Sequence, residues 1–340
     1  MKIFIRADGG NFIGLGHIMR MLVLAEEFSK KHEVIFLCRI AKIQEKYKAG
    51  IDKIQEGGFK VLKISEDDVV NDIIKLQIQH KAKLLITDSY EVNEEYFVKL
   101  KPYFDLTCYV DDVNKGKMDV DFIINQNMYA PNMDYFNNIN SKTKLFLGTT
   151  FCMLRKEFRE TYNKKEIRKK VKHILLTLGG MDKDFNTVKI LNQISECSQT
   201  IHVVIGKAFQ ESIKIELKQI AEKKHNIILH EDANMSQLMI ECDIAIAACG
   251  STLYELCAMR VPTIGIVVAE NQELLADIMK GQGVIIDAIN SDELENCNIK
   301  ALLMEAIQNN ELRMNIIEKQ KVLVNVNGVS KLVREIEGLF

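Results

Sequence analysis

The chain lacks an excess of charge of either sign, since its 340 residues carry a formal net charge of −2. Nothing in this balance favours nucleic acid as a partner. It also lacks any apolar run near the roughly 20 residues of a membrane span. The N-terminus begins with a predicted strand and does not have the layout of a signal peptide, so we expect no stable membrane association. A hydrophobic content of 47% is that of an ordinary globular protein, and the length predicts about two domains.

No two cysteines have Cys-x-x-Cys spacing, and the eight cysteines are scattered along the chain. We therefore interpret them as reduced, small core hydrophobes of a cytoplasmic protein, and we expect neither a disulfide framework nor a metal site. The seven histidines are scattered too. His173, His202 and His230 flank or end predicted strands and are interpreted as structural.

Apolar strands and amphipathic helices alternate along the chain in two series. Strands are predicted first at 2–7, 33–38, 60–63, 83–88, 106–111, 121–125 and 144–148, and then at 172–178, 201–205, 226–230, 243–247, 263–267 and 283–287. The helices between them include 17–30, 40–56, 68–80, 92–100, 184–195, 252–259 and 292–308. This alternation predicts an α/β protein with two doubly wound, Rossmann-like, mostly parallel sheets. A strongly charged stretch near 152–170 is interpreted as a solvated helix and linker between them.

The segment Gly14-Leu15-Gly16-His17 lies between the first strand and the first helix. Glycines allow a sharp bend and the close approach of a ligand, and the helix start directs free N–H groups at it. His17 stands at this point with a side chain that can exchange a proton near neutral pH. The pattern is neither the dinucleotide fingerprint nor a Walker A motif. A tight turn followed by an ordinary helix residue remains the alternative interpretation.

Polar loops also follow strands of the second series. Gly179-Gly180 lets backbone amides face a phosphate, and Gly250-Ser251-Thr252 opens a helix with hydroxyl and N–H donors. Glu255 lies one turn further on, where a carboxylate can accept from ribose hydroxyls. A simple turn and a plain N-cap are the alternatives for the two loops. Because both loops follow strands of one sheet, we expect a diphosphate site at its carboxyl edge.

Taken in order, several motifs resemble the nucleotide-sugar hydrolases of pseudaminic acid biosynthesis. These are the UDP-2,4-diacetamido-2,4,6-trideoxy-β-L-altropyranose hydrolases, or PseG family, with the related spore-coat polysaccharide proteins. The motifs are Arg6-x-Asp8, Ile13-Gly14-x-Gly16-His17, Asp88-Ser89-Tyr90, Asp111-Asp112, Asn127-Met128-Tyr129-Ala130, Leu154-Arg155-Lys156-Glu157-Phe158, Gly179-Gly180-Met181-Asp182, Ser251-Thr252-Leu253-Tyr254-Glu255 and Asn271-Gln272. The Gly-Gly loop and the Ser/Thr-x-x-Glu helix are also shared with the glycosyltransferases that resemble MurG.

The resemblance implies a GT-B fold, in which two Rossmann-like domains face a cleft. Residues 1–155 would form the N-terminal sugar and catalytic domain, residues 156–325 the C-terminal UDP-binding domain, and residues 326–340 a helix that packs back on the first domain. The implied site residues are His17 as the catalytic group, Gly14, Gly16, Tyr90 and Asn271 at the sugar, Gly179, Gly180, Ser251 and Thr252 at the diphosphate, and Glu255 at the ribose.

The implied reaction is hydrolysis of a UDP-linked diacetamido-trideoxyhexose, with water attacking the anomeric carbon with inversion. His17 is either the general base or the group that orients the water. Backbone amides can stabilise the leaving UDP without a metal, so we expect no metal and no cofactor. The partners are then a UDP-sugar substrate and UDP. Transfer of the sugar to an acceptor is the alternative, and binding without catalysis is a third. The sequence leaves the exact sugar and the oligomeric state open.

Overall fold

The computed structural model describes residues 1–10, 13–41 and 46–340. Two parts of the predictions lie outside the described residues. One is Asn11-Phe12 in the glycine-rich loop, and the other is residues 42–45 of the helix predicted at 40–56. The described contacts divide the chain into two compact units, of which the first contains Met1–Leu154 and Asn327–Phe340 and the second contains Arg155–Val326.

The first unit is built on a parallel sheet of seven strands in the order β3-β2-β1-β4-β5-β6-β7. The strands are β1 (Lys2–Ala7), β2 (Glu33–Ile40), β3 (Lys60–Ser65), β4 (Leu84–Asp88), β5 (Leu106–Val110), β6 (Phe122–Asn125) and β7 (Lys144–Leu147). β4 is buried along its whole length, as expected of a strand covered on both faces. From β1, successive strands are added on one side as β2 and β3 and then on the other side as β4 to β7, so the strand order reverses beside β1. In sheets of this kind, ligands bind outside the carboxyl ends of the strands at such a switch point.

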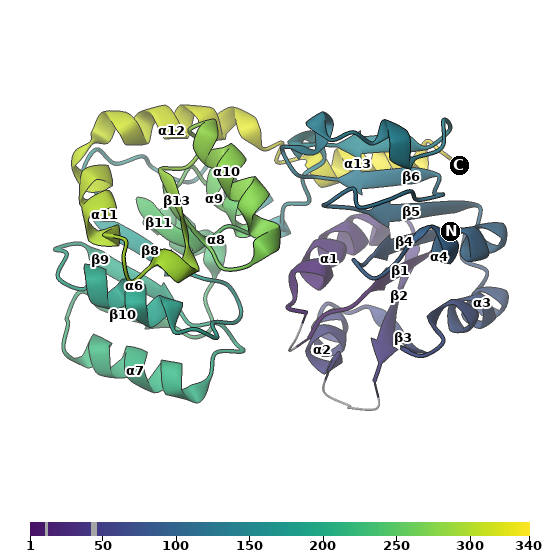
Figure 1. Ribbon diagram of the computed structural model, residues 1–340, viewed down its shortest axis with the longest axis horizontal. Helices are drawn as coiled ribbons and strands as arrows, with labels where there is room; N and C mark the ends of the chain where they lie inside the picture. Colours follow the sequence, from purple (N-terminus) through teal and green to yellow (C-terminus); the bar gives the residue numbers. More distant parts are fainter. Residues whose placement is uncertain (11–12, 42–45) are drawn as a thin grey trace. The chain divides into compact units, whose positions relative to one another are not determined.

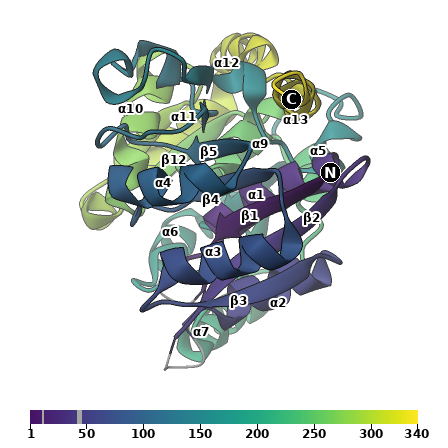
Figure 2. The same cartoon turned by 90° about the vertical axis from the view of Figure 1, so that its right-hand side faces the viewer.

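Helices cover both faces of this sheet. They are α1 (Gly16–Ser29), α2 (Lys48–Glu56), α3 (Val69–His80), α4 (Glu94–Leu100) and α13 (Gly328–Glu337), with 3-10 turns η1 (Lys101–Tyr103), η2 (Ala130–Asn132), η3 (Phe136–Asn138) and η4 (Thr149–Phe151). Ile3 and Ile5 on one face of β1 share a core with α1, α2 and α13. Phe4 on the other face shares a second core with α3 and α4, which cover that face in Figure 2.

The second unit is built on a parallel sheet of six strands in the order β10-β9-β8-β11-β12-β13 (Figure 1). The strands are β8 (His173–Thr177), β9 (Thr200–Val204), β10 (Ile227–His230), β11 (Ile244–Ala248), β12 (Thr263–Val267) and β13 (Asp287–Asn290). The helical segments are α5 (Lys156–Arg159), α6 (Asn186–Ile194), α7 (Glu211–Glu222), α8 (Met235–Glu241), α9 (Thr252–Ala258), η5 (Glu270–Gln272), α10 (Glu273–Gly281), η6 (Ser291–Glu293), α11 (Ile299–Gln308) and α12 (Asn310–Leu323). The two sheets confirm the predicted α/β class with Rossmann-like units.

Two predicted elements of the second unit are wrong in their bounds. The strand predicted at 283–287 starts only at Asp287, because α10 runs to Gly281 and Gly283 then takes a positive φ of 64°. The helix predicted at 292–308 is two elements, since η6 ends at Glu293 and α11 begins at Ile299. The side chain of Asn298 caps α11 by accepting a 2.9 Å hydrogen bond from the N–H of Ala301, and this fixes its start.

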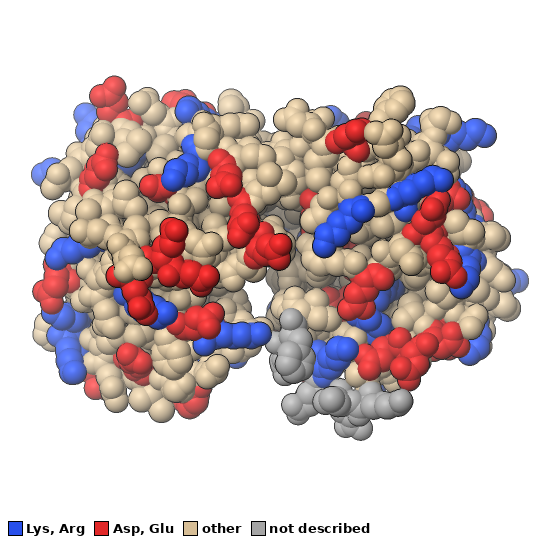
Figure 3. All heavy atoms as spheres, viewed as in Figure 1, with Lys and Arg blue, Asp and Glu red and all other residues tan. Residues whose placement is uncertain are grey.

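The surface of the described chain carries both signs of charge. On the face in Figure 3, basic and acidic side chains are interspersed over both units, in agreement with the small net charge. Among the described residues, no helix combines the length and the apolar composition that a membrane crossing requires.

Candidate active site

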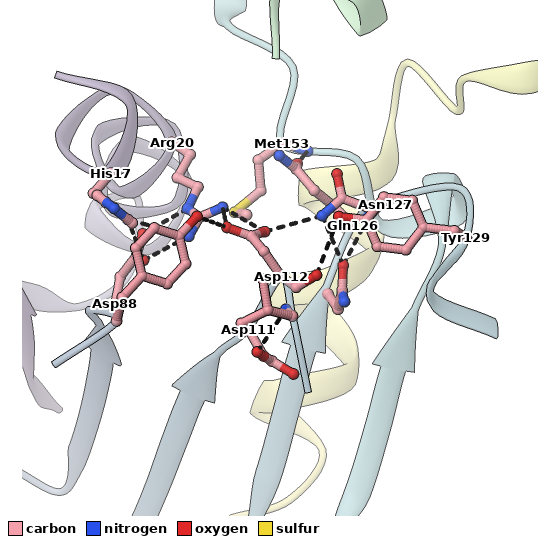
Figure 4. Close-up of polar contacts among 12 residues, drawn as sticks. His17, Arg20, Asp88, Asp111, Asp112, Gln126, Asn127, Tyr129 and Met153 are labelled. Atoms are coloured by element: carbon pink, nitrogen blue, oxygen red, sulfur yellow. Dashed lines mark hydrogen bonds and ion pairs between the residues drawn. The ribbon is translucent and has the colours of Figure 1, made fainter. Parts of the chain in front are cut away.

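A set of polar side chains lies at the carboxyl ends of four neighbouring strands of the first sheet. β1 leads through the glycine-rich loop into α1, which carries His17 and Arg20. Asp88 ends β4, Asp112 follows β5 and Asn127 follows β6. Figure 4 shows these side chains converging, with hydrogen bonds and ion pairs running from one to the next. Parallel strands bring their carboxyl ends to one edge, so residues distant in sequence meet there.

His17 is held by a buried carboxylate. Its Nδ1 lies 2.6 Å from Oδ1 of Asp88, whose side chain is fully buried. A carboxylate only accepts hydrogen bonds, so we assign the proton to Nδ1 and the free lone pair to Nε2. The His17 side chain remains 12% exposed, and its ring makes an edge contact with Tyr90 at 4.8 Å between centroids. In the neutral imidazole, this arrangement holds the Nε2 lone pair in a fixed orientation.

Arg20 connects two carboxylates of the site. Its Nε and Nη2 donate to the two oxygens of Asp88 at 2.6 Å each, and its Nη1 donates to both oxygens of Asp112 at 2.8 Å. Burial alone would raise the pKa of Asp88, but the charge of Arg20 and the hydrogen bonds from Arg20 and His17 outweigh it and hold that pKa well below its ordinary value. The pKa of Arg20 is raised because Asp112 and Asp88 outweigh the effect of its burial. Asp88 therefore stays an anion at neutral pH.

Asp112 receives hydrogen bonds from three sides. Besides Arg20, the hydroxyl of Tyr90 donates to its Oδ2 at 2.7 Å and Nδ2 of Asn127 donates to its Oδ1 at 2.9 Å. The hydroxyl of Tyr129 donates to its backbone oxygen at 3.1 Å. The aspartate before it, Asp111, instead accepts from backbone N–H groups of its own loop and is 1% exposed. Of this acidic pair, Asp112 belongs to the site and Asp111 shapes the loop.

The two predicted glycines of the first unit lie where the loop meets α1. Gly14 has a positive φ of 75° and exchanges two backbone hydrogen bonds with Gly10, at 2.9 and 3.0 Å. This conformation favours glycine. Gly16 begins α1 and is exposed, and Leu15 before it gives no side-chain cap to the helix. The described geometry therefore brings His17, Gly14, Gly16 and Tyr90 to one edge of the first sheet.

The remaining predicted residues lie at the carboxyl edge of the second sheet. Gly179-Gly180 follows β8, Ser251-Thr252 begins α9 after β11, and Asn271 lies in η5 after β12. These three strands are adjacent in the order β8-β11-β12, so their loops share one edge. Gly179 has a positive φ of 93°, and a Cβ at Gly179 or Gly180 would meet no atom within 4 Å. The hydroxyl of Ser251 makes no cap hydrogen bond with its own helix.

Glu255 has a protein partner that the sequence did not indicate. Its Oε1 accepts from Nε of Arg155 at 2.6 Å and its Oε2 accepts from Nη2 at 2.9 Å. Arg155 also contacts Glu157 through Nη1 at 2.7 Å. Burial raises the pKa of Glu255, and Arg155 offsets this only in part. A ribose hydroxyl at Glu255 would have to use the lone pairs that Arg155 leaves, or displace it.

Sequence reasoning also missed Arg20, and it quoted Asp88 and Asp112 only as parts of motifs. A signal for Arg20 exists, because it lies three residues after His17 and hence on the same helix face. In the described part of the chain, only His173, His202 and Glu241 form a group of His, Cys, Asp or Glu side chains close enough to share a metal ion. None of these three belongs to the sets at the carboxyl edges.

Comparison with solved structures defines the class of protein. MurG from Acinetobacter baumannii superposes with a TM-score of 0.69, covers 99% of both chains and is 12% identical in sequence. At this identity the likeness shows the fold alone. Together with the two Rossmann-like sheets, it establishes the GT-B fold that the sequence resemblance implied.

Sequence comparison then gives the family. Residues 133–330 match the family model described as lipid-A-disaccharide synthetase, and the chain belongs to this family. Its named relatives support the PseG/SpsG group. An uncharacterised protein of Methanocaldococcus jannaschii is 30% identical over 95% of this chain and 69% of its own length. The UDP-2,4-diacetamido-2,4,6-trideoxy-β-L-altropyranose hydrolase of Campylobacter jejuni is 27% identical over 84% of this chain and 99% of its own.

Proposed function

We propose that this protein hydrolyses a UDP-linked diacetamido-trideoxyhexose to UDP and the free sugar, with inversion, in the biosynthesis of a nonulosonic acid of the pseudaminic type. The named Campylobacter jejuni relative is a hydrolase of such a UDP-sugar and aligns over nearly its whole length. We further propose that the protein acts in the cytoplasm and needs neither a metal ion nor a cofactor for this reaction.

The observation that carries the proposal is the hydrogen bond of 2.6 Å between His17 and Asp88. With Nδ1–H donated to Asp88, the lone pair of the neutral imidazole lies on Nε2, which is the form that a general base requires. Asp88 is in turn held by Arg20, so the base, the group that orients it and the support of that group form one connected set. Water is a weak nucleophile, and an oriented base in this position supplies the activation that hydrolysis demands.

In the proposed step, water attacks the anomeric carbon on the face opposite UDP. A C–O bond forms to the water oxygen, the C–O bond to the diphosphate breaks, and UDP leaves with the bonding electron pair. His17 takes a proton from the water through Nε2, or it orients the water while the proton passes to solvent. Tyr90, in contact with the His17 ring, is proposed to bind a hydroxyl or acetamido group of the sugar, and we propose the same kind of role for Asn271.

We propose that the second unit binds the UDP part. Gly179 and Gly180 expose backbone N–H groups without obstruction by a side chain, and Ser251 and Thr252 add hydroxyl donors at the same edge. These donors would stabilise the charge that develops on the departing diphosphate. Glu255 is assigned to the ribose, with Arg155 keeping it oriented. Gly14 and Gly16 are assigned to the sugar side of the substrate.

Transfer of the sugar to an acceptor is the second candidate, since the matched family model is described as a synthetase and the fold is that of MurG. It would use the same UDP contacts and the same His17, with an acceptor hydroxyl in place of water. The two candidates differ in one respect, namely whether water is a sufficient acceptor.

The test is a UDP-release assay on the full chain with a small panel of UDP-diacetamido-trideoxyhexoses, without added acceptor and with a chelator present. We expect release of UDP and free sugar, and a fall in kcat of about 10²–10⁴-fold in His17→Ala. His225→Ala, which removes an exposed histidine of the second unit, is the matched control and should keep the wild-type rate. Tight binding of the UDP-sugar without release would refute hydrolysis and favour transfer.

A further inference from the structure

Three histidines lie on three adjacent strands of the second sheet and face the same side. His173 begins β8, His202 lies in the middle of β9 and His230 ends β10. The register pairs Leu175 with His202 and His202 with Ile228. Since side chains two residues apart share a face, the three imidazoles project from one face of the sheet. The opposite face, with Ile174 and Leu176, packs the apolar core of this unit.

The imidazoles lie in direct contact, and a carboxylate joins them. Nδ1 of His173 is 3.0 Å from Nε2 of His202 and 3.8 Å from Oε1 of Glu241, the last residue of α8. One ligand atom from each of these three residues lies within 4.8 Å of the other two. Two ligands bound at 2.0–2.1 Å to a tetrahedral zinc ion are about 3.4 Å apart, so small side-chain rotations would complete the site.

The contact on the far side of His202 orients it for this purpose. Its Nδ1 lies 3.0 Å from Nε2 of His230. If Nδ1 of His202 carries the proton and donates to His230, its Nε2 lone pair points to His173 and Glu241. A metal-binding histidine is commonly fixed in this way by a partner on its other nitrogen. His202 itself is buried, with 3% of its surface exposed, so bulk water competes little with these partners.

We propose that His173, His202 and Glu241 bind a divalent transition-metal ion of the zinc type, with His230 as a positioning residue. Two imidazoles and a carboxylate suit zinc, whereas magnesium and calcium prefer oxygen ligands throughout. The fourth position is left for water, which can reach it because the side chains of His173 and Glu241 are 24% and 42% exposed. The ion would tie β8 and β9 to the end of α8.

The site is separate from the proposed UDP contacts. His173 begins β8, whereas the Gly179-Gly180 loop follows the other end of that strand. Glu241 likewise precedes β11, at the amino edge of the sheet, and Ser251 follows its carboxyl end. The proposed ion therefore lies apart from the proposed UDP contacts, and we assign it no part in the hydrolysis. The inference stands whether the protein is a hydrolase or a transferase.

The test is titration of the full chain, prepared without a polyhistidine tag, with zinc by calorimetry and with cobalt(II) by visible absorption. We expect one ion per chain and, for cobalt, the intense bands of a tetrahedral site. His202→Gln and Glu241→Gln should weaken binding more than about 100-fold, and His230→Gln by about 10–100-fold. A rise in the melting temperature of the wild type on addition of zinc should vanish in the same variants.

His225→Gln is the matched control, because it removes an exposed histidine of the same unit and should bind zinc as the wild type does. Should His202→Gln fail to fold, the partly exposed Glu241 still provides a variant that circular dichroism can verify. Absence of zinc binding by the wild type overturns the proposal and leaves a plain chain of hydrogen-bonded imidazoles. Equal binding by the wild type and all the variants overturns it as well.

Discussion

The candidate sites of the two units use different chemical groups. In the first unit, the site consists of charged side chains joined by hydrogen bonds and ion pairs. Arg20 binds both Asp88 and Asp112, and Asp88 also binds His17. In the second unit, the predicted contacts are exposed loops such as Gly179-Gly180, and hydrogen bonds would come from backbone and hydroxyl groups. This difference agrees with the proposed roles, in which the first unit supplies the base and the second unit binds the diphosphate. An oriented base needs a rigidly held side chain, whereas a diphosphate needs several hydrogen-bond donors.

The candidate site of each unit contains a carboxylate buried against an arginine, yet the pKa values of these two carboxylates move in opposite directions. Burial opposes ionisation in both. Asp88 has two cationic or proton-donating partners, Arg20 and His17, and its pKa falls. Within the described ranges, Glu255 is paired only with Arg155, which is shared with the like-charged Glu157, and the pKa of Glu255 rises. The direction is thus decided by how many partners compensate the loss of water.

The largest effect should come from Asp88→Asn. The amide removes the charge that compensates Arg20 and no longer fixes the tautomer of His17. We expect a loss of about 3–5 kcal/mol in the free energy of unfolding, as for a broken buried ion pair, and a fall in kcat of about 10²–10⁴-fold. Urea unfolding and the UDP-release assay measure the two effects, and nitrogen NMR of the imidazole reports the tautomer.

Asp105→Asn is the control for this variant. Asp105 is 57% exposed and pairs with Lys83 at 3.0 Å in the same unit, so its loss should cost less than about 1 kcal/mol. If Asp88→Asn kept both the rate and the imidazole tautomer of the wild type, Asp88 would have no positioning role. If both variants cost the same free energy, the burial of Asp88 would not matter.

The same contrast explains which features of the two sites can be predicted from the sequence and which cannot. His17 and Gly179 are visible locally, because each follows a predicted strand at a position where parallel sheets gather ligands. The partner of His17 is 71 residues away, and that of Glu255 is 100 residues away, so pairing depends on which strands become neighbours. For the same reason, the sequence does not reveal that His173, His202 and His230 are in contact with one another. The bounds of the strand predicted at 283–287 are wrong for a local reason, because a hydrophobic pattern does not indicate the positive φ of Gly283.

Gly179→Ala tests the second unit at the level of the backbone. Gly179 has a φ of 93° and open space around it, so the strain comes from conformation and not from a clash. We expect a loss of about 1–2 kcal/mol in the free energy of unfolding and weaker UDP binding in calorimetry. Gly180→Ala is the matched control, because a Cβ there also meets no atom within 4 Å and its φ is not positive. Equal effects of the two variants would argue against a conformational requirement at Gly179.

The smallest expected effect is the pH dependence of the free energy of unfolding. The contributions of Asp88 and Glu255 to this free energy should change with pH in opposite directions. The folded pKa of Asp88 lies below the unfolded value of about 3.9, so its contribution is complete above that pH and is lost as the pH falls. The folded pKa of Glu255 lies above the unfolded value of about 4.3, so its contribution is complete below that pH and is lost as the pH rises through the folded pKa.

Urea unfolding between about pH 3 and 7 on the wild type, Asp88→Asn and Glu255→Gln isolates each slope as a difference, with at most about 1.4 kcal/mol per pH unit. Relative to Asp88→Asn, the wild type should lose stability towards acid. Relative to Glu255→Gln, it should lose stability towards neutral pH. Slopes of the same sign would mean that Arg155 compensates the burial of Glu255 as fully as Arg20 and His17 compensate that of Asp88. The second unit would then hold its carboxylate as an anion by one bidentate arginine alone, which the sharing of Arg155 with Glu157 argues against.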